Sequence, residues 1–404
     1  MPFAPCSLRV SRMRTSVLFL TNAYPDFDTS YRGIFIKKMA TLLQKEGYEI
    51  TVVTPKIYKK SQYFENQDGI RVYRFPFFSG NKLLIEYAKV PYLRMVVYYL
   101  AGFLMTIYAT IKTRSNLIHV HWAIPTGVIG AMVNLLLREP FIVTIHGSDL
   151  RLAMERQGLL GRLFVFVCKR ANHLNCVSEI QKKEMEGIGF WEKDVTVIPM
   201  GVDQEFIEAR KRRNDKPKNQ SFTILSNRNL LPIYNLSLLI RSTPLVLKKE
   251  PETRFLIAGN GLEREKLEKE AKDLNVDKFI QFLGSVPHEA MPDLLTKADI
   301  YVSTSLYDGT SVSLLEAMAV GVFPIVTDIT SNREWIRDGE NGFLVPVNDE
   351  QYLANKIIEA IRDKGLLEKA YKENQSVSEE KTLWPVCIKK IKKIYEDQKA
   401  GSEI

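Results

Sequence analysis

The sequence has few cysteines, few histidines and no long hydrophobic run, and each shortage argues against a class of protein. Four cysteines without a CxxC pair, in 404 residues, do not suit a disulfide-stapled secreted scaffold, so a reduced, cytosolic compartment is expected. The five histidines form no HExxH or similar pattern, and we expect no metal site. No uninterrupted apolar run reaches the roughly 18 residues that mark a membrane-spanning helix.

The most apolar stretch is Val96–Ile111, which lies between Arg94 and Lys112. Because it is shorter than the roughly 20 residues of a bilayer span, we predict a buried core helix, with a membrane-dipping helix as the alternative.

The N-terminal region shows no targeting signal. The apolar run Val17–Leu20 is too short for the apolar core of a signal peptide, and no small-residue cleavage site follows it. We expect residues 1–14 to be a disordered extension, unless Met13 is the true start.

Positive charge is concentrated in the first half of the chain. Residues 1–205 carry 26 Lys and Arg against 17 Asp and Glu, whereas residues 220–404 carry 24 against 28. A basic surface attracts anionic partners such as phosphates or acidic lipid head groups, although it also simply favours solubility. No nucleic-acid-binding motif is present, so a nucleic-acid partner is not expected.

Short, continuously apolar segments alternate with helical patterns, as in a parallel sheet that is covered on both faces. In the first half the predicted strands are Ser16–Thr21, Glu49–Thr54, Leu117–His121, Phe141–His146 and His173–Val177, with helices at Gly33–Glu46, Thr126–Leu137 and Leu160–Ala171. In the second half they are Phe222–Ser226, Arg254–Ala258, Ile280–Leu283, Ile300–Ser303 and Phe323–Thr327. The fold class is therefore α/β, with two doubly wound domains.

The predicted domains are residues 15–205 and 220–380. Residues 206–219 are expected to form a solvated linker, because this segment is highly charged and has few apolar residues. Residues 381–404 are expected to form a C-terminal helix. Ligands of doubly wound sheets bind at the carboxyl ends of strands, so a site lined by these loops, in a cleft between the domains, is expected.

Several polar residues of the first half follow strands. The loop 21–33 ends in Gly33 before a helix, which suits phosphate or sugar binding through backbone N–H groups. His146 and Asp149 follow another strand, where His146 can donate to a sugar or phosphate and Asp149 can instead cap the next helix. Asp26-Phe27-Asp28 formally matches a metal-binding DxD motif, but two carboxylates in a loop are more often turn residues. His119 and His121 have no evident third ligand, so structural hydrogen bonding is expected rather than metal binding.

The second half carries a richer set at its strand ends. Arg228 can bind a diphosphate through two parallel hydrogen bonds, or it can form an ordinary ion pair within the protein. Gly259 and Gly261 form a tight turn that lacks the pattern of a nicotinamide site. The residues that open the next loop and helix offer carboxylates and backbone N–H groups to a sugar and its phosphates: Asp308, Gly309, Thr310, Ser311 and Glu316.

In this order, these residues resemble glycosyltransferase family 4, a family of retaining enzymes with the GT-B fold. The resemblance covers the chain from about Val17 to Ile394 and is most specific in the element Asp308-x7-Glu316 with Leu315-Glu-Ala-Met-Ala-x-Gly321. It implies two Rossmann-like domains that face a cleft, and an enzyme that transfers a hexosyl or N-acetylhexosaminyl group from a nucleotide sugar.

The resemblance also implies roles for individual residues. Glu316 would hold the ribose hydroxyls, Asp308 and His146 would contact the donor sugar, and Arg228 would bind the diphosphate. Gly33 would approach the phosphates. No cofactor and no essential metal are expected.

Two departures from the family pattern concern the diphosphate. Asp308 stands where the family usually has Glu, and the Lys that usually follows the Arg is missing after Arg228. Tyr234 or Asn235 is expected to substitute by hydrogen bonding. An epimerase or phosphorylase with the same fold, or a non-catalytic sugar-nucleotide binder, remains an alternative hypothesis.

The acceptor implied by the resemblance is a saccharide or lipid-linked precursor in surface polysaccharide or glycoconjugate biosynthesis. We expect a cytoplasmic enzyme whose basic N-terminal half can contact the inner face of the cell membrane.

Overall fold

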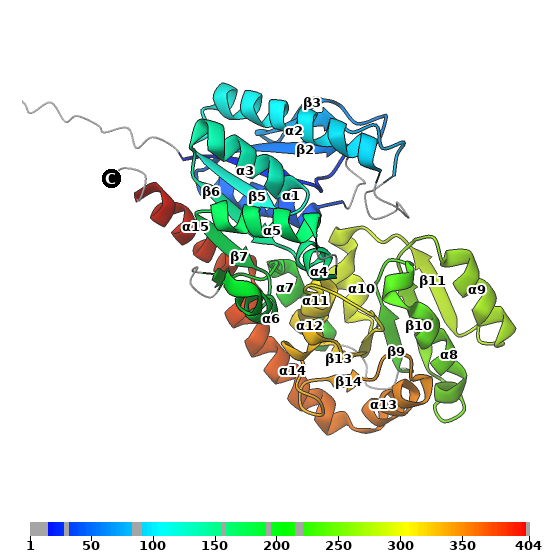
Figure 1. Ribbon diagram of the computed structural model, residues 1–404. Coiled ribbons are helices and arrows are strands. Elements are labelled where there is room, and N and C mark those ends of the chain that lie inside the picture. Colours follow the sequence, from blue (N-terminus) through cyan, green and yellow to red (C-terminus); the bar gives the residue numbers. More distant parts are fainter. Residues whose placement is uncertain are drawn as a thin grey trace, which may run out of the picture. The chain divides into compact units, whose positions relative to one another are not determined.

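The chain contains two sheets of mainly parallel strands flanked by helices, which confirms the predicted α/β class with two Rossmann-like domains (Figure 1). This computed structural model describes residues 15–27, 32–82, 91–155, 158–190, 195–214 and 221–400. Its contacts define two compact units. Unit 1 lies within Met1–Val143, Arg162–Asn172 and Tyr395–Ile404, and unit 2 lies within Thr144–Gly161 and His173–Ile394.

The first sheet has the strand order β3-β4-β2-β1-β5-β6-β7-β8. Its strands are β1 (Ser16–Thr21), β2 (Glu49–Lys56), β3 (Phe64–Gln67), β4 (Ile70–Pro76), β5 (Leu117–His121), β6 (Phe141–Ile145), β7 (His173–Cys176) and β8 (Val195–Val197). Strand β1 is fully buried and pairs in parallel with β2 and β5, so that Val17 lies opposite Ile50 and Leu117. Its unbroken apolar run is explained by this central position.

The second sheet has the order β11-β10-β9-β12-β13-β14, and all its recorded pairings are parallel. Its strands are β9 (Thr223–Ser226), β10 (Arg254–Ala258), β11 (Ile280–Gly284), β12 (Ile300–Ser303), β13 (Phe323–Thr327) and β14 (Phe343–Val345). The order reverses between β9 and β12. Loops at this switch point are therefore the natural place for a ligand.

The helices connect these strands. They are α1 (Ile34–Lys45), α2 (Tyr92–Thr113), α3 (Thr126–Leu137), α4 (Ser148–Glu155), α5 (Leu159–Arg170), α6 (Glu179–Met185), α7 (Gln204–Asn214), α8 (Leu236–Leu247), α9 (Arg264–Asp273), α10 (Met291–Thr296), α11 (Val312–Val320), α12 (Thr330–Arg333), α13 (Glu350–Arg362), α14 (Lys364–Val377) and α15 (Trp384–Ala400). Each predicted strand is present, as are the helices predicted at Gly33–Glu46, Thr126–Leu137 and Leu160–Ala171, with ends that differ by at most two residues. Helix α2 begins four residues before the predicted helix Val96–Ile111, and α15 begins three residues after the start of the predicted C-terminal helix.

The hairpin of β3 and β4 was not predicted. The two strands pair antiparallel around Asp68 and Gly69, whose φ angles are 52° and 89°. Positive φ at both turn residues is the geometry that Asp-Gly favours in a two-residue hairpin. The Asp-Gly pair was therefore a signal for this turn.

The prediction of a solvated linker over 206–219 is wrong up to Asn214. Helix α7 covers Gln204–Asn214, and Phe206, Ile207 and Ala209 are buried in the core of unit 2. Arg210 is also buried and pairs with Glu379 at 2.8 Å. A few well-placed apolar side chains are enough to bury one face of a mostly charged helix. Residues 215–220 lie outside the described residues, as does the N-terminal extension 1–14.

The prediction for Val96–Ile111 was half right. The segment is helical, within α2, but it is not a buried core helix: only 28% of its most apolar window is buried. Among the described helices, α2 alone is long and apolar enough to cross a membrane by length and composition.

Candidate active site

Arg228 follows β9 at the switch point of the second sheet and is almost fully buried. Its guanidinium forms an ion pair with Asp308 and donates to the hydroxyls of Ser311 at 2.9 Å and Ser313 at 2.8 Å. The ring of Tyr234 lies against its other side, 4.2 Å from the guanidinium carbon. A planar group held on several sides has one orientation, which is what recognition of a diphosphate requires.

The surroundings of Arg228 favour its charged form. Burial lowers its pKa, but the neighbouring Asp308 more than offsets this and raises the pKa above the ordinary value. Among the described residues, the buried Nε of Arg228 has no hydrogen-bond acceptor. Burying an N–H donor without an acceptor costs free energy, so this N–H group is well suited to donate a hydrogen bond to an oxygen of a ligand.

Tyr234 takes part in this arrangement in a way the sequence did not indicate. We expected Tyr234 or Asn235 to replace the missing Lys by hydrogen bonding. Tyr234 instead stacks on the guanidinium, whereas the side chain of Asn235 donates to Asn348 at 2.9 Å. The structure therefore does not bring the Asn235 side chain to Arg228.

The loop between β12 and α11 supplies Asp308 and the helix cap. Asp308 accepts a hydrogen bond from the Gly309 N–H at 2.9 Å while its other oxygen contacts Arg228. The Ser311 hydroxyl caps α11 by accepting from the Leu314 N–H at 3.3 Å. The N-terminus of α11 thus opens directly beside the Arg228 guanidinium, and both favour negative charge.

Glu316 lies one turn further along α11 and is buried. It accepts a hydrogen bond from His288 Nε2 at 2.9 Å. Burial raises the pKa of Glu316, although the His288 hydrogen bond opposes this, and the same hydrogen bond raises the pKa of His288 against the effect of burial. Both shifts favour a proton held on the pair.

His288 was missed by the sequence analysis. It lies four residues beyond Gly284, the last residue of β11, and so follows a strand of the second sheet. This position at the carboxyl end of a strand was the available signal.

Two glycines allow the segment after β6 to approach the loop after β12. A Cβ atom on Gly309 would lie 2.4 Å from the His146 carbonyl oxygen, and one on Gly147 would lie 2.9 Å from the Gly309 Cα. Tyr307 donates to the Gly147 carbonyl and Thr310 to the Val177 carbonyl, both at 3.0 Å. The structure therefore brings the His146 backbone to Gly309, the residue after Asp308.

Asp149 has a structural role in this arrangement. Its buried carboxylate accepts from the backbone N–H groups of His146 at 3.2 Å and Gly147 at 3.0 Å. These bonds fix the turn before α4. Asp149 lies within the first turn of α4 and accepts from N–H groups that precede the helix, so it is not the N-cap residue of the capping alternative.

Gly259 and Gly261 act through close backbone approach. A Cβ at Gly259 would lie 2.3 Å from the Arg228 carbonyl oxygen, and one at Gly261 would lie 2.3 Å from that of Leu230. The tight turn predicted for this pair therefore supports the loop that carries Arg228.

The predicted residues of unit 1 lie in other local arrangements. Gly33 has a φ of 67° and packs on the Ala23 carbonyl, where a Cβ would lie at 2.2 Å. Asp26 is buried and pairs with Arg32 at 2.8 Å, so it is a structural carboxylate, while Asp28 lies outside the described residues. His119 Nδ1 lies 2.5 Å from the Tyr395 hydroxyl, in line with a structural hydrogen bond.

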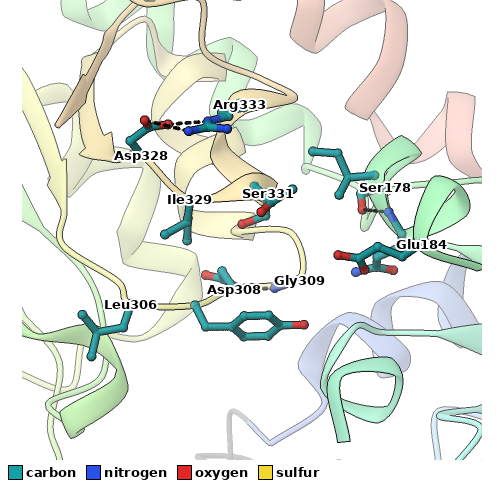
Figure 2. A pocket seen from close by; sticks show the side chains of 13 residues that line it. Ser178, Glu184, Leu306, Asp308, Gly309, Asp328, Ile329, Ser331 and Arg333 are labelled. Carbon is teal, nitrogen blue, oxygen red and sulfur yellow. Dashed lines mark hydrogen bonds and ion pairs between the residues drawn. The ribbon is translucent and has the colours of Figure 1, made fainter. Parts of the chain in front are cut away.

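A pocket opens beside Asp308 at the carboxyl ends of β7, β12 and β13, as expected for a ligand site of such sheets (Figure 2). Asp308 and Gly309 line it together with Gln181 and Ser331. The Gln181 Nε2 and Ser331 Oγ atoms are buried and have no hydrogen-bond partner within the part of the chain that the structure describes. These polar atoms can bind the hydroxyls of a ligand.

Charged residues also line the pocket, namely Glu184, Asp328 and Arg333. Arg333 pairs with Asp328 through two hydrogen bonds of 2.6 and 2.9 Å, and this pair lowers the pKa of Asp328 (Figure 2). Burial raises the pKa of Glu184. Within the described ranges, no group of three or more His, Cys, Asp or Glu side chains is arranged to hold a metal ion.

Two family models match consecutive parts of the chain. The model described as Glycosyltransferase Family 4 matches residues 33–206, and the model described as Glycosyl transferases group 1 matches residues 207–377.

Similar proteins agree with these models. The UDP-Gal:alpha-D-GlcNAc-diphosphoundecaprenol alpha-1,3-galactosyltransferase of Escherichia coli is 24% identical, over 80% of this chain and 83% of its own. The phosphatidyl-myo-inositol mannosyltransferase of Mycobacterium tuberculosis is 26% identical, over 70% and 73%. Anabaena HepE, solved in complex with UDP and glucose, superposes with a TM-score of 0.71 at 17% identity, over 95% of this chain and all of its own, which shows a shared GT-B fold.

Proposed function

Because the chain belongs to glycosyltransferase family 4, we propose that it transfers a sugar from a nucleotide-sugar donor to a saccharide or lipid-linked acceptor, with retention of anomeric configuration. The observation that carries this proposal is the convergence of Arg228, Asp308 and Glu316 beside the N-terminus of α11. It offers one fixed cation and two carboxylates at one edge of a sheet.

Arg228 is proposed to bind the diphosphate of the donor. Its Nε donor and the N-terminus of α11 both favour an anionic group. The stabilisation that they provide increases as negative charge develops on the leaving diphosphate. In this structure Asp308 occupies the Nη2 edge of the guanidinium. When the donor binds, we expect Asp308 to turn toward a hydroxyl of the donor sugar.

Glu316 is proposed to bind the ribose hydroxyls. A carboxylate accepts several hydrogen bonds, so it can hold the ribose while His288 continues to donate to it. His288 then acts as a positioning residue, because it fixes the orientation of the Glu316 side chain.

Chemistry at this site is proposed to rest on positioning and on stabilisation of the leaving group. The charge on the diphosphate is met by Arg228 and by backbone N–H groups, without an obligatory covalent nucleophile and without an essential metal ion. Removal of metal ions by EDTA is accordingly expected to leave the rate unchanged.

We propose a lipid-linked acceptor at the cytoplasmic face of the cell membrane. The Escherichia coli relative is named for a diphosphoundecaprenol acceptor, and the mycobacterial relative is named for phosphatidyl-myo-inositol. The basic first half of the chain favours an anionic acceptor of this kind.

The proposal is tested by donor binding followed by turnover. Purified protein is heated with UDP-, GDP-, ADP- or CMP-sugars, with and without EDTA, and a ligand of the folded state raises the melting temperature. We expect one selective stabiliser that is insensitive to EDTA, and loss of its effect in Glu316→Ala but not in the exposed control Glu252→Ala. No response to any donor would contradict the proposal.

A further inference from the structure

Helix α2 of unit 1 has its large apolar side chains on the outside. Seven of them are exposed, and most recur at every fourth residue along one face: Tyr92, Leu93, Val96, Leu100, Leu104, Tyr108 and Ile111. The exposed fractions of Leu100 and Leu104 are 60% and 65%. A soluble helix normally shows the reverse arrangement, with its large apolar residues facing the core.

The opposite face of α2 packs on the protein through small and hydroxylated residues. Gly102 lies so close to the core that a Cβ would meet Ile129 at 2.6 Å and Phe75 at 3.2 Å. The hydroxyls of Thr106, Thr110 and Thr113 each donate to the carbonyl four residues earlier, at 2.7 Å. The buried face is therefore satisfied internally, and α2 is firmly a part of unit 1.

Helix α3 is a neighbour of α2 in unit 1. The two helices pack against each other and lie side by side in Figure 1. Helix α3 also exposes large apolar side chains, namely Met132, Leu135 and Leu136. Apolar patches larger than the usual few hundred Å² on a protein surface mark binding sites for proteins or membranes.

The charges of α2 indicate which partner fits. Helix α2 contains no Asp or Glu, while Arg94 lies near its start and Lys112 near its end, with Arg114 directly after it. All three cations are exposed. Basic residues at the ends of an apolar face complement a bilayer that contains anionic lipids.

The shape and the aromatic residues of α2 also favour a lipid bilayer as the partner. Its 22 residues form a rod about 33 Å long, at about 1.5 Å per residue, with the apolar side chains along one line. The exposed Tyr92 and Tyr108 lie toward its two ends, and tyrosine favours the membrane–water interface. A fluid bilayer accepts such a convex apolar line without needing a matching groove.

We propose that unit 1 docks on an anionic lipid bilayer through the exposed face of α2, with the helix lying in the interface rather than crossing it. Because the other face packs on β2, β4 and α3, the helix stays with the protein. This inference rests on the proposed function, since a lipid-linked acceptor is presented at such a surface. The exposed apolar residues of α2 given above are the ones expected to contact the bilayer.

The test measures sedimentation of the full chain with two kinds of vesicle. One consists of phosphatidylcholine alone, and in the other a third of the lipid is anionic phosphatidylglycerol. We expect binding to the anionic vesicles that weakens as salt is added. Binding to neither kind, or equally to both, would overturn the proposal.

Substitutions on α2 test whether its exposed face is the surface that binds the vesicles. Leu100→Glu with Leu104→Glu is expected to weaken vesicle binding about 100-fold, roughly tenfold for each leucine lost from the lipid contact. Lys112→Glu should weaken it by several fold. The matched control is Leu262→Glu on the exposed surface of unit 2, where the exposed fraction is 80%, and it should bind like the wild type. Unchanged binding in the double variant would overturn the proposal.

Two further measurements separate membrane docking from donor binding and from self-association. Donor-induced stabilisation is measured in the absence of lipid, and it should be the same in the double variant and the wild type. If the wild type binds the donor but not the vesicles, only the proposed membrane-docking surface is contradicted. If the wild type does not bind the donor, the proposed function is contradicted. A dimer that the double variant dissociates, without vesicle binding, would assign the face to a second copy and overturn the proposal.

Discussion

Two replacements of Arg228 separate the contribution of its charge to kcat from the contribution of its planar geometry. Arg228→Ala removes the cation and leaves the Asp308 carboxylate, the Ser311 hydroxyl and the Ser313 hydroxyl without their donor. Loss of one preorganised donor to a developing anion costs about 2.7–4 kcal/mol, so kcat should fall by about 10²–10³. Arg228→Lys keeps the charge but cannot form the planar fork, and kcat should fall by about 10–10².

The same replacements should change stability by smaller amounts. Hydrogen bonds to a charged group contribute about 1.5–3 kcal/mol, and the partly exposed Asp308 is resolvated when Arg228 is lost. We therefore expect Arg228→Ala to lower the free energy of unfolding by about 1–3 kcal/mol, with the protein still folded at room temperature.

The assay is release of nucleoside diphosphate at saturating donor, with urea unfolding of each variant in parallel. The control is Arg362→Ala on α13, which removes a largely exposed ion pair with Glu250 and should change the free energy of unfolding by less than about 1 kcal/mol. Normal turnover in a folded Arg228→Ala variant would refute the role assigned to this residue.

Three other predictions follow from the packing and the electrostatics of unit 2. Gly309→Ala places a Cβ 2.4 Å from the His146 carbonyl, so it should cost about 1–3 kcal/mol of stability in urea unfolding; an unchanged midpoint would contradict this contact. The pKa values of His288 and Glu316 are raised in the folded state, so the folded state binds more protons than the unfolded state. Stability should therefore fall as the pH rises above the ordinary pKa values, which are 4.5 for Glu316 and 6.5 for His288. Glu316→Gln should flatten that slope, and an equal slope in both proteins would exclude this pair as its source. Phe206→Ala should lower stability by about 3–5 kcal/mol, because α7 belongs to the core; a loss below about 1 kcal/mol would restore the linker hypothesis.

The sheets were predictable because burial on both faces leaves an unmistakable pattern. Strands such as β1 and β12 are uninterrupted apolar runs with polar residues immediately after them, and both have the predicted bounds. The same pattern located Arg228 and Asp308, because residues that follow parallel strands meet at one edge of the sheet.

Tertiary contacts decided what the sequence pattern left open. The charged composition of α7 concealed three apolar residues that pack in a core built by distant segments. The contact between His288 and Glu316 joins residues 28 positions apart and has no local pattern. For α2, the pattern indicated an apolar helix, but Tyr98 and several small or hydroxylated residues took the buried positions, and most of the large apolar residues are outside.

The most direct test of the account is the anomeric configuration of the product together with its dependence on Glu316. The donor selected by thermal stabilisation is incubated with a lipid-linked saccharide acceptor, and the new linkage is identified by NMR. The account predicts the same anomeric configuration as in the donor, with turnover at least about 10²-fold lower in Glu316→Ala and unchanged in Glu252→Ala. An inverted linkage, or normal turnover in Glu316→Ala, would contradict it.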